Sequence, residues 1–153
     1  MQKIQISDIS KLSAVNDVLH DEYFDLDDIK HDKDRSMIEI PFRRIFHYHS
    51  PPRIIKWRIF WKIGEVDVLR CLLQIASAKK YKVIDKSRIG TFSFNGLEYD
   101  QKSNRITIIT HEDCRMEINV SDLLIEYTEL EYRGKARITY GLFWESSSGK
   151  VYE

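Results

Sequence analysis

The chain has 153 residues, of which 42% are hydrophobic and 31% charged, with only 6 Gly and 3 Pro. A chain of this length fits one domain, residues 1–153, that buries enough surface to need no disulfide or metal support, and its composition excludes long disordered linkers. No stretch approaches the roughly 18 apolar residues of a membrane-spanning helix. The start of the chain has no signal-peptide core, so we expect a cytoplasmic protein.

Charge is segregated along the chain, although the 24 basic and 24 acidic residues cancel. Residues 1–40 carry ten acids and five bases, a net charge of −5. Residues 41–90 carry three acids and twelve bases (+9), and residues 91–153 carry eleven acids and seven bases (−4). Such blocks indicate either a surface for a partner or strands whose charges complement each other after folding.

A short amphipathic helix is predicted over residues 8–20. Its apolar side chains recur at three- and four-residue spacing at Ile9, Leu12, Val15 and Leu19. Asp8 or Ser10 can cap its N-terminus by accepting hydrogen bonds from free backbone N–H groups.

After this helix the pattern changes to period two, which predicts antiparallel strands through most of residues 26–145. Residues 27–42 read as a strand, a polar turn and a strand, and 53–63 as one alternating strand that Gly64 ends. Residues 66–80 fit a helix or a buried strand, and a strand is favoured because every neighbouring segment is β. The predicted fold is therefore mainly β, an antiparallel β-sandwich or open barrel with one short N-terminal helix.

Turns and repeats complete this prediction. Asn95-Gly96 is a possible tight turn, and a closing hairpin is expected around residues 133–135, with 146–153 as a frayed tail. Residues 29–40 overlay 97–108 without gaps, each with an Asp, a polar turn and an alternating strand. The overlay indicates either two related halves or the general likeness of β-hairpins.

Residues 19–34, LHDEYFDLDDIKHDKD, hold seven carboxylates and two histidines. The segment lacks the central Gly of an EF-hand loop. His20 and Asp21 at the helix end and His31 beyond the next strand leave a metal site open. The alternative is a solvated hairpin, in which Asp25 and His31 face solvent and the following aspartates form the turn.

Two further groups are metal-capable. His47 and His49 are two residues apart, which puts both rings on one face of a strand, and the turn HEDC could add His111 and Cys114. Convergence of Asp25, His31, His47, His49 and His111 in one cleft would indicate a metal-dependent hydrolase. A polar β-turn explains the HEDC segment equally.

Residues 42–62 interleave six bases with six aromatic residues and contain no acid. Bases that neutralise phosphates beside rings that stack on nucleobases are typical of single-stranded nucleic-acid binding. The alternation predicts that Trp57 and Trp61 face the core. The residues expected to bind nucleic acid are Arg53, Lys56, Arg58, Phe60 and Lys62.

Enzyme signatures are missing: the chain has no GxGxxG, GxxxxGK[ST], GxSxG, HExxH or CxxC motif. The two cysteines, Cys71 and Cys114, have neither metal-like nor redox spacing, which favours a reducing compartment. No catalytic residue and no cofactor are predicted.

Several short motifs resemble a group of small bacterial β-rich domains of unknown function, some assigned as toxin-immunity proteins. They are the leucine-His-Asp step at residues 19–21, the strand MIEIPF, the apolar strand VLRCLLQI before a turn with Asp85, and the pattern CRMEINVSDLLIEY. The resemblance spans roughly residues 18–128 and implies binding without a cofactor. The chain departs from the group at 43–63 and in an added C-terminal hairpin, so no functional residue is carried over.

These observations lead to a non-catalytic binding domain whose leading partner is a protein. Nucleic-acid binding and metal-dependent hydrolysis are the alternatives. The partner's identity and the oligomeric state are left open.

Overall fold

The structure is a computed structural model that describes the backbone of residues 2–45, 53–57, 61–86, 88–141 and 145–152. Side chains are described for residues 2–44, 67–86 and 88–131. The elements in chain order are β1 (Lys3–Ile6), η1 (Ile9–Lys11), α1 (Leu12–Leu19), β2 (Tyr23–Asp25), η2 (Leu26–Asp28), β3 (Lys30–Asp32), β4 (Met37–Ile45), β5 (Arg53–Trp57), β6 (Trp61–Ile75), β7 (Ala78–Asp85), β8 (Thr91–Asp100), β9 (Arg105–Thr110), β10 (Cys114–Val120), β11 (Ile125–Gly141) and β12 (Glu145–Tyr152).

The strands form one sheet in the order β1-β11-β6-β4-β2-β8-β9-β10-β7, with β12 paired to β11, β3 to β4 and β5 to β6. The strand pairs whose register is defined are antiparallel. The path ends at β1 and at β7, so the sheet is not closed into a barrel. The predicted mainly β fold with one short N-terminal helix is confirmed.

The chain divides into two compact units. Unit 1 comprises Met1–Phe42 and Cys71–Glu129, and unit 2 comprises Arg43–Arg70 and Leu130–Glu153. The expectation of a single domain stays a prediction.

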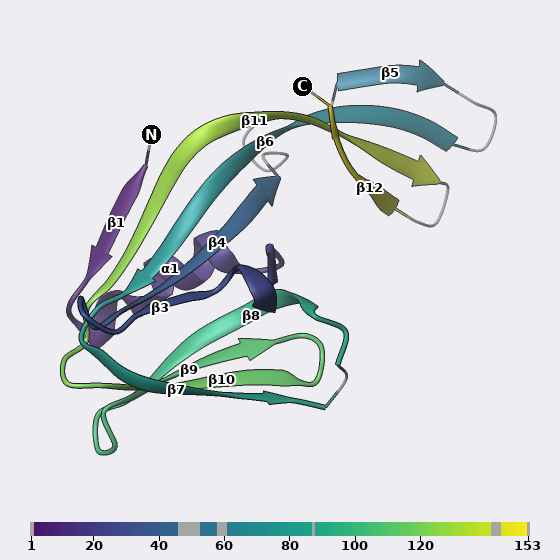
Figure 1. Ribbon diagram of the computed structural model, residues 1–153. Helices are drawn as coiled ribbons and strands as arrows, with labels where there is room; N and C mark the ends of the chain where they lie inside the picture. Colours follow the sequence, from purple (N-terminus) through teal and green to yellow (C-terminus); the bar gives the residue numbers. More distant parts are fainter. Residues whose placement is uncertain (1, 46–52, 58–60, 87, 142–144, 153) are drawn as a thin grey trace. The chain divides into compact units, whose positions relative to one another are not determined.

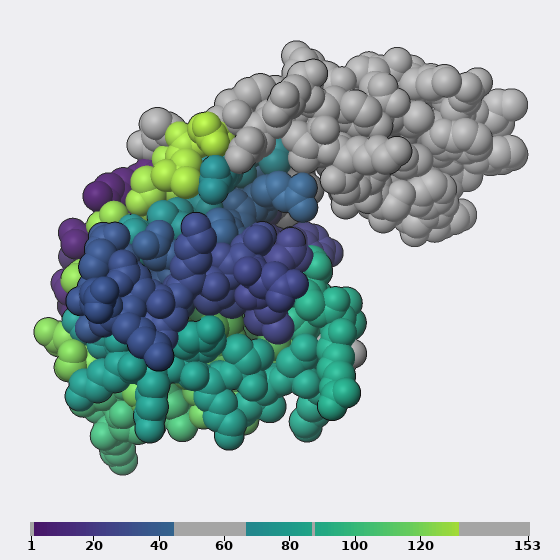
Figure 2. Space-filling model, viewed as in Figure 1, coloured from purple at the N-terminus to yellow at the C-terminus, as the bar shows by residue number. Residues whose placement is uncertain are grey.

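The core of unit 1 lies between two layers of the folded sheet (Figure 1). One layer contains β1, β11, β6 and β4, and the other contains β8, β9, β10 and β7. β9 and β10 alternate buried and more exposed residues, which is the pattern of strands with one face in the core and one toward solvent. In Figure 2 the purple and dark-blue N-terminal residues lie against the teal and green residues of the second layer.

The predicted helix is confirmed as a 3-10 turn followed by α1. Asp8 caps the turn, because its carboxylate accepts a hydrogen bond of 3.0 Å from the Ser10 N–H. α1 packs against β8 and β1 through one apolar face. The buried residues of that face are Leu12, Val15, Val18 and Leu19.

Residues 66–80 form strand rather than helix, as favoured from the sequence. β6 runs to Ile75 and β7 begins at Ala78, and Ser77 between them adopts a positive φ of 55°. Cys71, Leu73 and Ile75 are fully buried at every second position, which is a strand period.

The two overlaid segments form two hairpins in which the aligned Asp bonds a backbone N–H of the turn, three residues on at Asp32 and two residues on at Asp100. Asp32 accepts a bond of 3.0 Å from the Arg35 N–H, and Asp100 one of 2.9 Å from the Lys102 N–H. Ser36 and Asn104, which the overlay aligns, close the turns with φ of 51° and 50°. The likeness therefore extends from sequence to turn conformation.

Two turn predictions were wrong. Asn95-Gly96 lies inside β8, where the register with β9 shifts between Phe94 and Gly96, so the Gly marks a β-bulge and not a chain reversal. Residues 133–135 lie within the continuous strand β11. Residues 146–152 lie in β12, which pairs with β11, and the expectation of a frayed tail over 146–153 stays a prediction.

The segment 53–63, expected to be a single strand, is also corrected. β5 and β6 pair antiparallel, with Trp57 opposite Lys62 and Arg53 opposite Glu65, and Gly64 continues β6 instead of ending a strand. A period of two continues through both arms of a hairpin, so alternation alone does not detect the reversal.

Candidate functional site

Three side chains with metal-ligating atoms meet at one end of the second layer: His20, Asp21 and His111 (the His–Asp cluster). The Asp21 carboxylate lies between the rings, with one oxygen 3.1 Å from His20 Nδ1 and the other 2.8 Å from His111 Nε2. The two imidazole rings stand edge to face with centroids 5.3 Å apart. All three residues are exposed, so the cluster is open to solvent.

The backbone holds both parts of the His–Asp cluster on β8. α1 ends at Leu19, and Asp21 follows with a φ of 67°. The Asp21 N–H donates to the Phe94 carbonyl (2.9 Å), and the His111 N–H donates to the Ser93 carbonyl (3.1 Å). Neighbouring residues of one strand therefore position ligands that are 90 positions apart in the sequence.

Glu112 fixes the turn that carries His111. Its carboxylate accepts bonds from the Ser93 N–H (2.9 Å) and the Ser93 hydroxyl (2.8 Å). Burial alone would raise the pKa of Glu112, but these bonds, together with the adjacent His111, hold that pKa below its ordinary value. Thr110 adds a bond from its hydroxyl to the Cys114 carbonyl (2.7 Å), so the turn is tied at both ends.

The residues of the predicted hydrolase do not all meet. His47 and His49 lie outside the described residues. Asp25 accepts a bond from the Thr91 hydroxyl, and the half-buried His31 ring packs on Tyr81, with centroids 5.4 Å apart. Within the described side chains, only His111 of that set belongs to a group of three metal-ligating residues. The sequence had indicated His20 and Asp21 as metal-capable residues, but it grouped them with His31 and not with His111.

Cys114 is no ligand in this arrangement. The side chain is buried, and burial raises the pKa of the thiol to about 11, with further contributions from the Asp85 and Glu112 carboxylates. Cys71 is also buried, with its Sγ 3.4 Å from the Tyr127 hydroxyl.

Cys114 is therefore expected to resist thiol reagents at neutral pH in the folded protein, because only the thiolate reacts and the folded state disfavours it. Labelling with Ellman's reagent before and after denaturation checks this, with Cys71→Ala to assign the signal. Fast labelling of Cys114 in the folded protein would contradict it.

A second candidate is the edge strand β7, where three lysines, Lys79, Lys80 and Lys82, are exposed (the β7 lysines). β7 ends the sheet path, and in the described part of the chain it pairs with the strand β10 alone, while at its start the Ala78 N–H donates to the Ser36 carbonyl (2.8 Å). The Lys86 N–H donates toward β10, to the Asp113 carbonyl (3.0 Å). Because bonding alternates along antiparallel strands, the backbone groups of Tyr81 and Val83 point to the free side.

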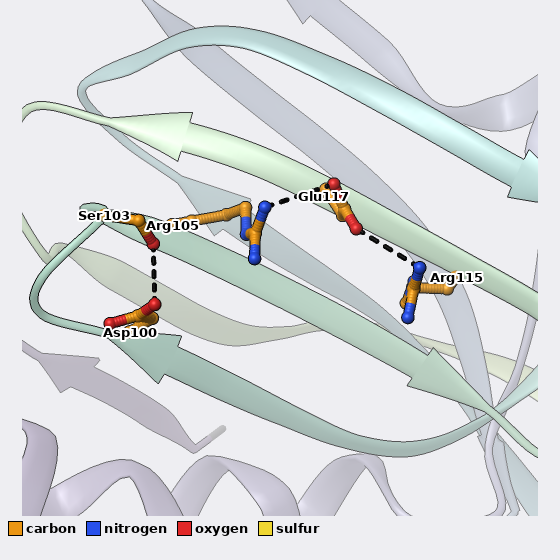
Figure 3. Close-up of polar contacts among 5 residues, drawn as sticks. All are labelled: Asp100, Ser103, Arg105, Arg115 and Glu117. Carbon is orange, nitrogen blue, oxygen red and sulfur yellow. Dashed lines mark hydrogen bonds and ion pairs between the residues drawn. The ribbon is translucent and has the colours of Figure 1, made fainter.

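Two carboxylates on the outer face of the second layer bond other residues (Figure 3). Lys82 lies opposite Glu117 in the register, but the Glu117 carboxylate already pairs with Arg105 and Arg115, each at 3.4 Å. Asp100 on β8 bonds the Ser103 hydroxyl of its own turn (2.8 Å), and that bond holds its pKa below the usual range. The charge of β7 is therefore available to a partner.

The residues expected to bind nucleic acid lie between positions 53 and 62, outside the described side chains. Arg58 and Phe60 lie outside the described residues, and Arg53, Lys56 and Lys62 have no described side chains. The backbone puts Lys56 opposite Ile63 in the β5–β6 pair. Nucleic-acid binding through this segment stays a prediction.

No family model, curated protein or solved structure matches the chain. Among the described residues, no helix has the length and apolar character needed to cross a bilayer.

Proposed function

We propose that this chain is a protein-binding domain without a catalytic role, and that β7 receives an extended acidic segment of its partner. The observation that carries the proposal is the free side of β7, where the outward backbone groups of Tyr81 and Val83 lie beside exposed lysines. An added strand would gain main-chain hydrogen bonds, and its side chains would supply the specificity.

The positive charge of β7 favours a partner segment that carries acidic residues. Lys80 and Lys82 lie on the outer face of β7 beside Arg115, because each is opposite an outward-facing residue of β10. A partner strand with acids at alternate positions would set them against this row, where cross-strand opposite charges are favourable. The resemblance to domains that act by binding supports the same class of function.

A protein partner is favoured over nucleic acid at β7 for two reasons. Exposed strand backbone recognises another strand, whereas nucleic acid needs rings on which bases stack. The one aromatic ring of β7, Tyr81, instead packs against His31. The two buried cysteines, which form no disulfide with each other, are consistent with the reducing cytoplasm that we propose as its location.

Fluorescence anisotropy with a labelled alternating glutamate–valine peptide tests the proposal. We expect binding that weakens by roughly tenfold or more in Lys80→Glu/Lys82→Glu, because two attractions become repulsions. Val83→Pro should also abolish binding, since it removes an outward N–H without breaking the ladder to β10. Lys102→Glu, an exposed charge reversal in the β8–β9 turn, is the matched control and should bind as the unchanged protein does.

Three results would contradict the proposal. Equal binding of a lysine–valine peptide would show that charge does not select the partner. Tight, steeply salt-dependent binding of single-stranded RNA or DNA would favour the 42–62 alternative, with a log–log slope of about −3 for four engaged bases. If neither the glutamate–valine peptide nor nucleic acid binds, the β7 lysines would serve only to prevent edge-to-edge association of the sheet.

A further inference from the structure

We propose that His20, Asp21 and His111 bind one divalent transition-metal ion, with Zn²⁺ as the best fit. The site would use His20 Nδ1, His111 Nε2 and a carboxylate oxygen of Asp21, and would leave at least one position for water or an external ligand. It involves no residue of β7 and so does not depend on the protein-binding proposal.

The three ligand atoms lie near enough to share one ion after side-chain rotation. They all lie within 4.8 Å of one another. Two ligands at about 2.0 Å from a tetrahedral zinc ion are about 3.3 Å apart. The two carboxylate–imidazole distances, 3.1 and 2.8 Å, are near that value and go to the two different oxygens of Asp21. Rotation of these exposed side chains that brings one Asp21 oxygen and both nitrogens to this spacing would admit the ion.

The backbone places Asp21 for this role. The residue one position beyond a helix C-cap is commonly Gly or Asn, because it adopts a left-handed conformation. Here Asp21 takes that conformation, with a φ of 67°, while the Glu22 N–H bonds the Leu19 carbonyl at 2.9 Å. The left-handed residue thus brings a carboxylate between the two imidazoles, where Gly would bring no side chain.

The ligands are also held before any ion binds. The Asp21 and His111 backbones each donate to β8, and the Glu112–Ser93 bonds fix the turn. A preorganised set loses less side-chain entropy on binding. The ion would join the end of α1 to the β9–β10 turn across β8.

The donor set selects the class of ion. Two imidazole nitrogens with one carboxylate suit zinc, copper, nickel or ferrous iron. Calcium requires six to eight oxygen ligands and magnesium is bound through oxygens and water, so neither fits this set.

Without a metal, the same geometry is an aspartate that accepts N–H bonds from two imidazoles, so a direct titration is required. The probe is Zn²⁺ alone, added to chelator-treated protein without a His-tag, in competition with a chromophoric chelator. We expect one ion per chain, a raised melting temperature, and no competition from Ca²⁺ or Mg²⁺. Substituting Co²⁺ should give the visible absorption of a low-coordinate site.

The variants His20→Gln, Asp21→Asn and His111→Gln each remove one ligand. Each should weaken Zn²⁺ binding by roughly a hundredfold or more, because loss of a residue that only hydrogen-bonds to a metal ligand already costs about 10–100-fold. Asp21→Asn is the most informative, since Asn also favours the left-handed conformation and the fold should persist. Asp28→Asn, another exposed aspartate, is the matched control.

The double variant His47→Ala/His49→Ala separates this site from the other histidine pair. It should keep the zinc affinity of the unchanged protein. If it loses the ion while Asp21→Asn keeps it, the assignment to the His–Asp cluster is overturned. The assignment is equally overturned if the unchanged protein binds no zinc, or if circular dichroism shows Asp21→Asn folded and its affinity unchanged.

Discussion

Replacing Phe94 by alanine is expected to lower the free energy of unfolding by about 3–5 kcal/mol, the largest effect of any single substitution proposed for this chain. Phe94 on β8 is fully buried. Truncation removes the transfer free energy of the ring and leaves a cavity that a packed interior fills only in part.

The position of Phe94 adds to this cost. The centroid of its ring lies 4.4 Å from the ring centroid of Phe24 on β2. It lies 5.5 Å from the ring centroid of Phe42 on β4, and these two rings stand edge to face. Phe42 in turn packs on Tyr127 of β11, with centroids 6.0 Å apart. Phe94 thus connects the two layers of unit 1, and aromatic pairs of this kind contribute about 0.5–1.5 kcal/mol beyond the area they bury.

Urea denaturation followed by circular dichroism measures the effect, with a lower midpoint at an unchanged slope. Tyr23→Ala is the matched control: Tyr23 pairs with Ser93 on the neighbouring strand but is 52% exposed, so the change should stay within about 0.5 kcal/mol. Phe94→Leu keeps most of the volume and should fall between the two. Equal midpoints for the Phe94 and Tyr23 alanine variants would show that the aromatic contacts are not central to the core.

The elements that the sequence predicted correctly have local signals. The turn residues of 101–104 and the alternation in 105–110 and 115–120 indicated β9 and β10, and the apolar spacing of 8–20 indicated α1. Each pattern indicates which face of the element is buried. That face is the same whichever strand the element pairs with, so a local signal is sufficient to predict it.

The wrong predictions concern chain reversals. Gly96 has the residue type of a turn but occupies a bulge, because β9 continues the pairing on both sides of it. Residues 133–135 have turn composition too, yet β11 continues through them. A Gly permits a turn without requiring one, so the pairing of distant strands decides.

The His–Asp cluster shows the same limit for sites. His20, Asp21 and His111 were each noticed as metal-capable, but in different groups. Their convergence depends on the pairing of β2 with β8 and of β8 with β9, which places residue 21 beside residue 94 and residue 111 beside residue 93. Nothing local in the sequence specifies that pairing.

Replacing Asn16 by alanine is the second substitution with a large expected effect. The Asn16 side chain in α1 bonds both backbone groups of Leu97: its Nδ2 donates to the Leu97 carbonyl (3.1 Å) and its Oδ1 accepts from the Leu97 N–H (2.7 Å). β2 pairs with β8 at residues 91–93, and backbone bonds from Asp21 and Glu22 extend the contact to Phe94. At Leu97, further along this side of β8, the amide of Asn16 takes the place of a neighbouring strand.

Loss of this amide should cost about 2–4 kcal/mol, because a buried backbone group left without a partner costs about 1–3 kcal/mol and two are involved. The higher helix propensity of alanine returns up to about 0.7 kcal/mol and does not offset the loss. Asp17→Ala, an exposed change on the next residue of α1, is the control and should be close to neutral.

Asn16→Asp separates the two bonds. A carboxylate still accepts from the Leu97 N–H but cannot donate to the Leu97 carbonyl, so an intermediate cost is expected. Hydrogen exchange gives the local measurement: the Leu97 amide should lose protection in Asn16→Ala and keep part of it in Asn16→Asp, while the amides of β9 and β10 stay protected in both. Unchanged protection of Leu97 in Asn16→Ala would mean that water or a shifted backbone replaces the side chain. In that case α1 would be held on β8 by its apolar face alone, and the measured cost should fall toward that of Asp17→Ala.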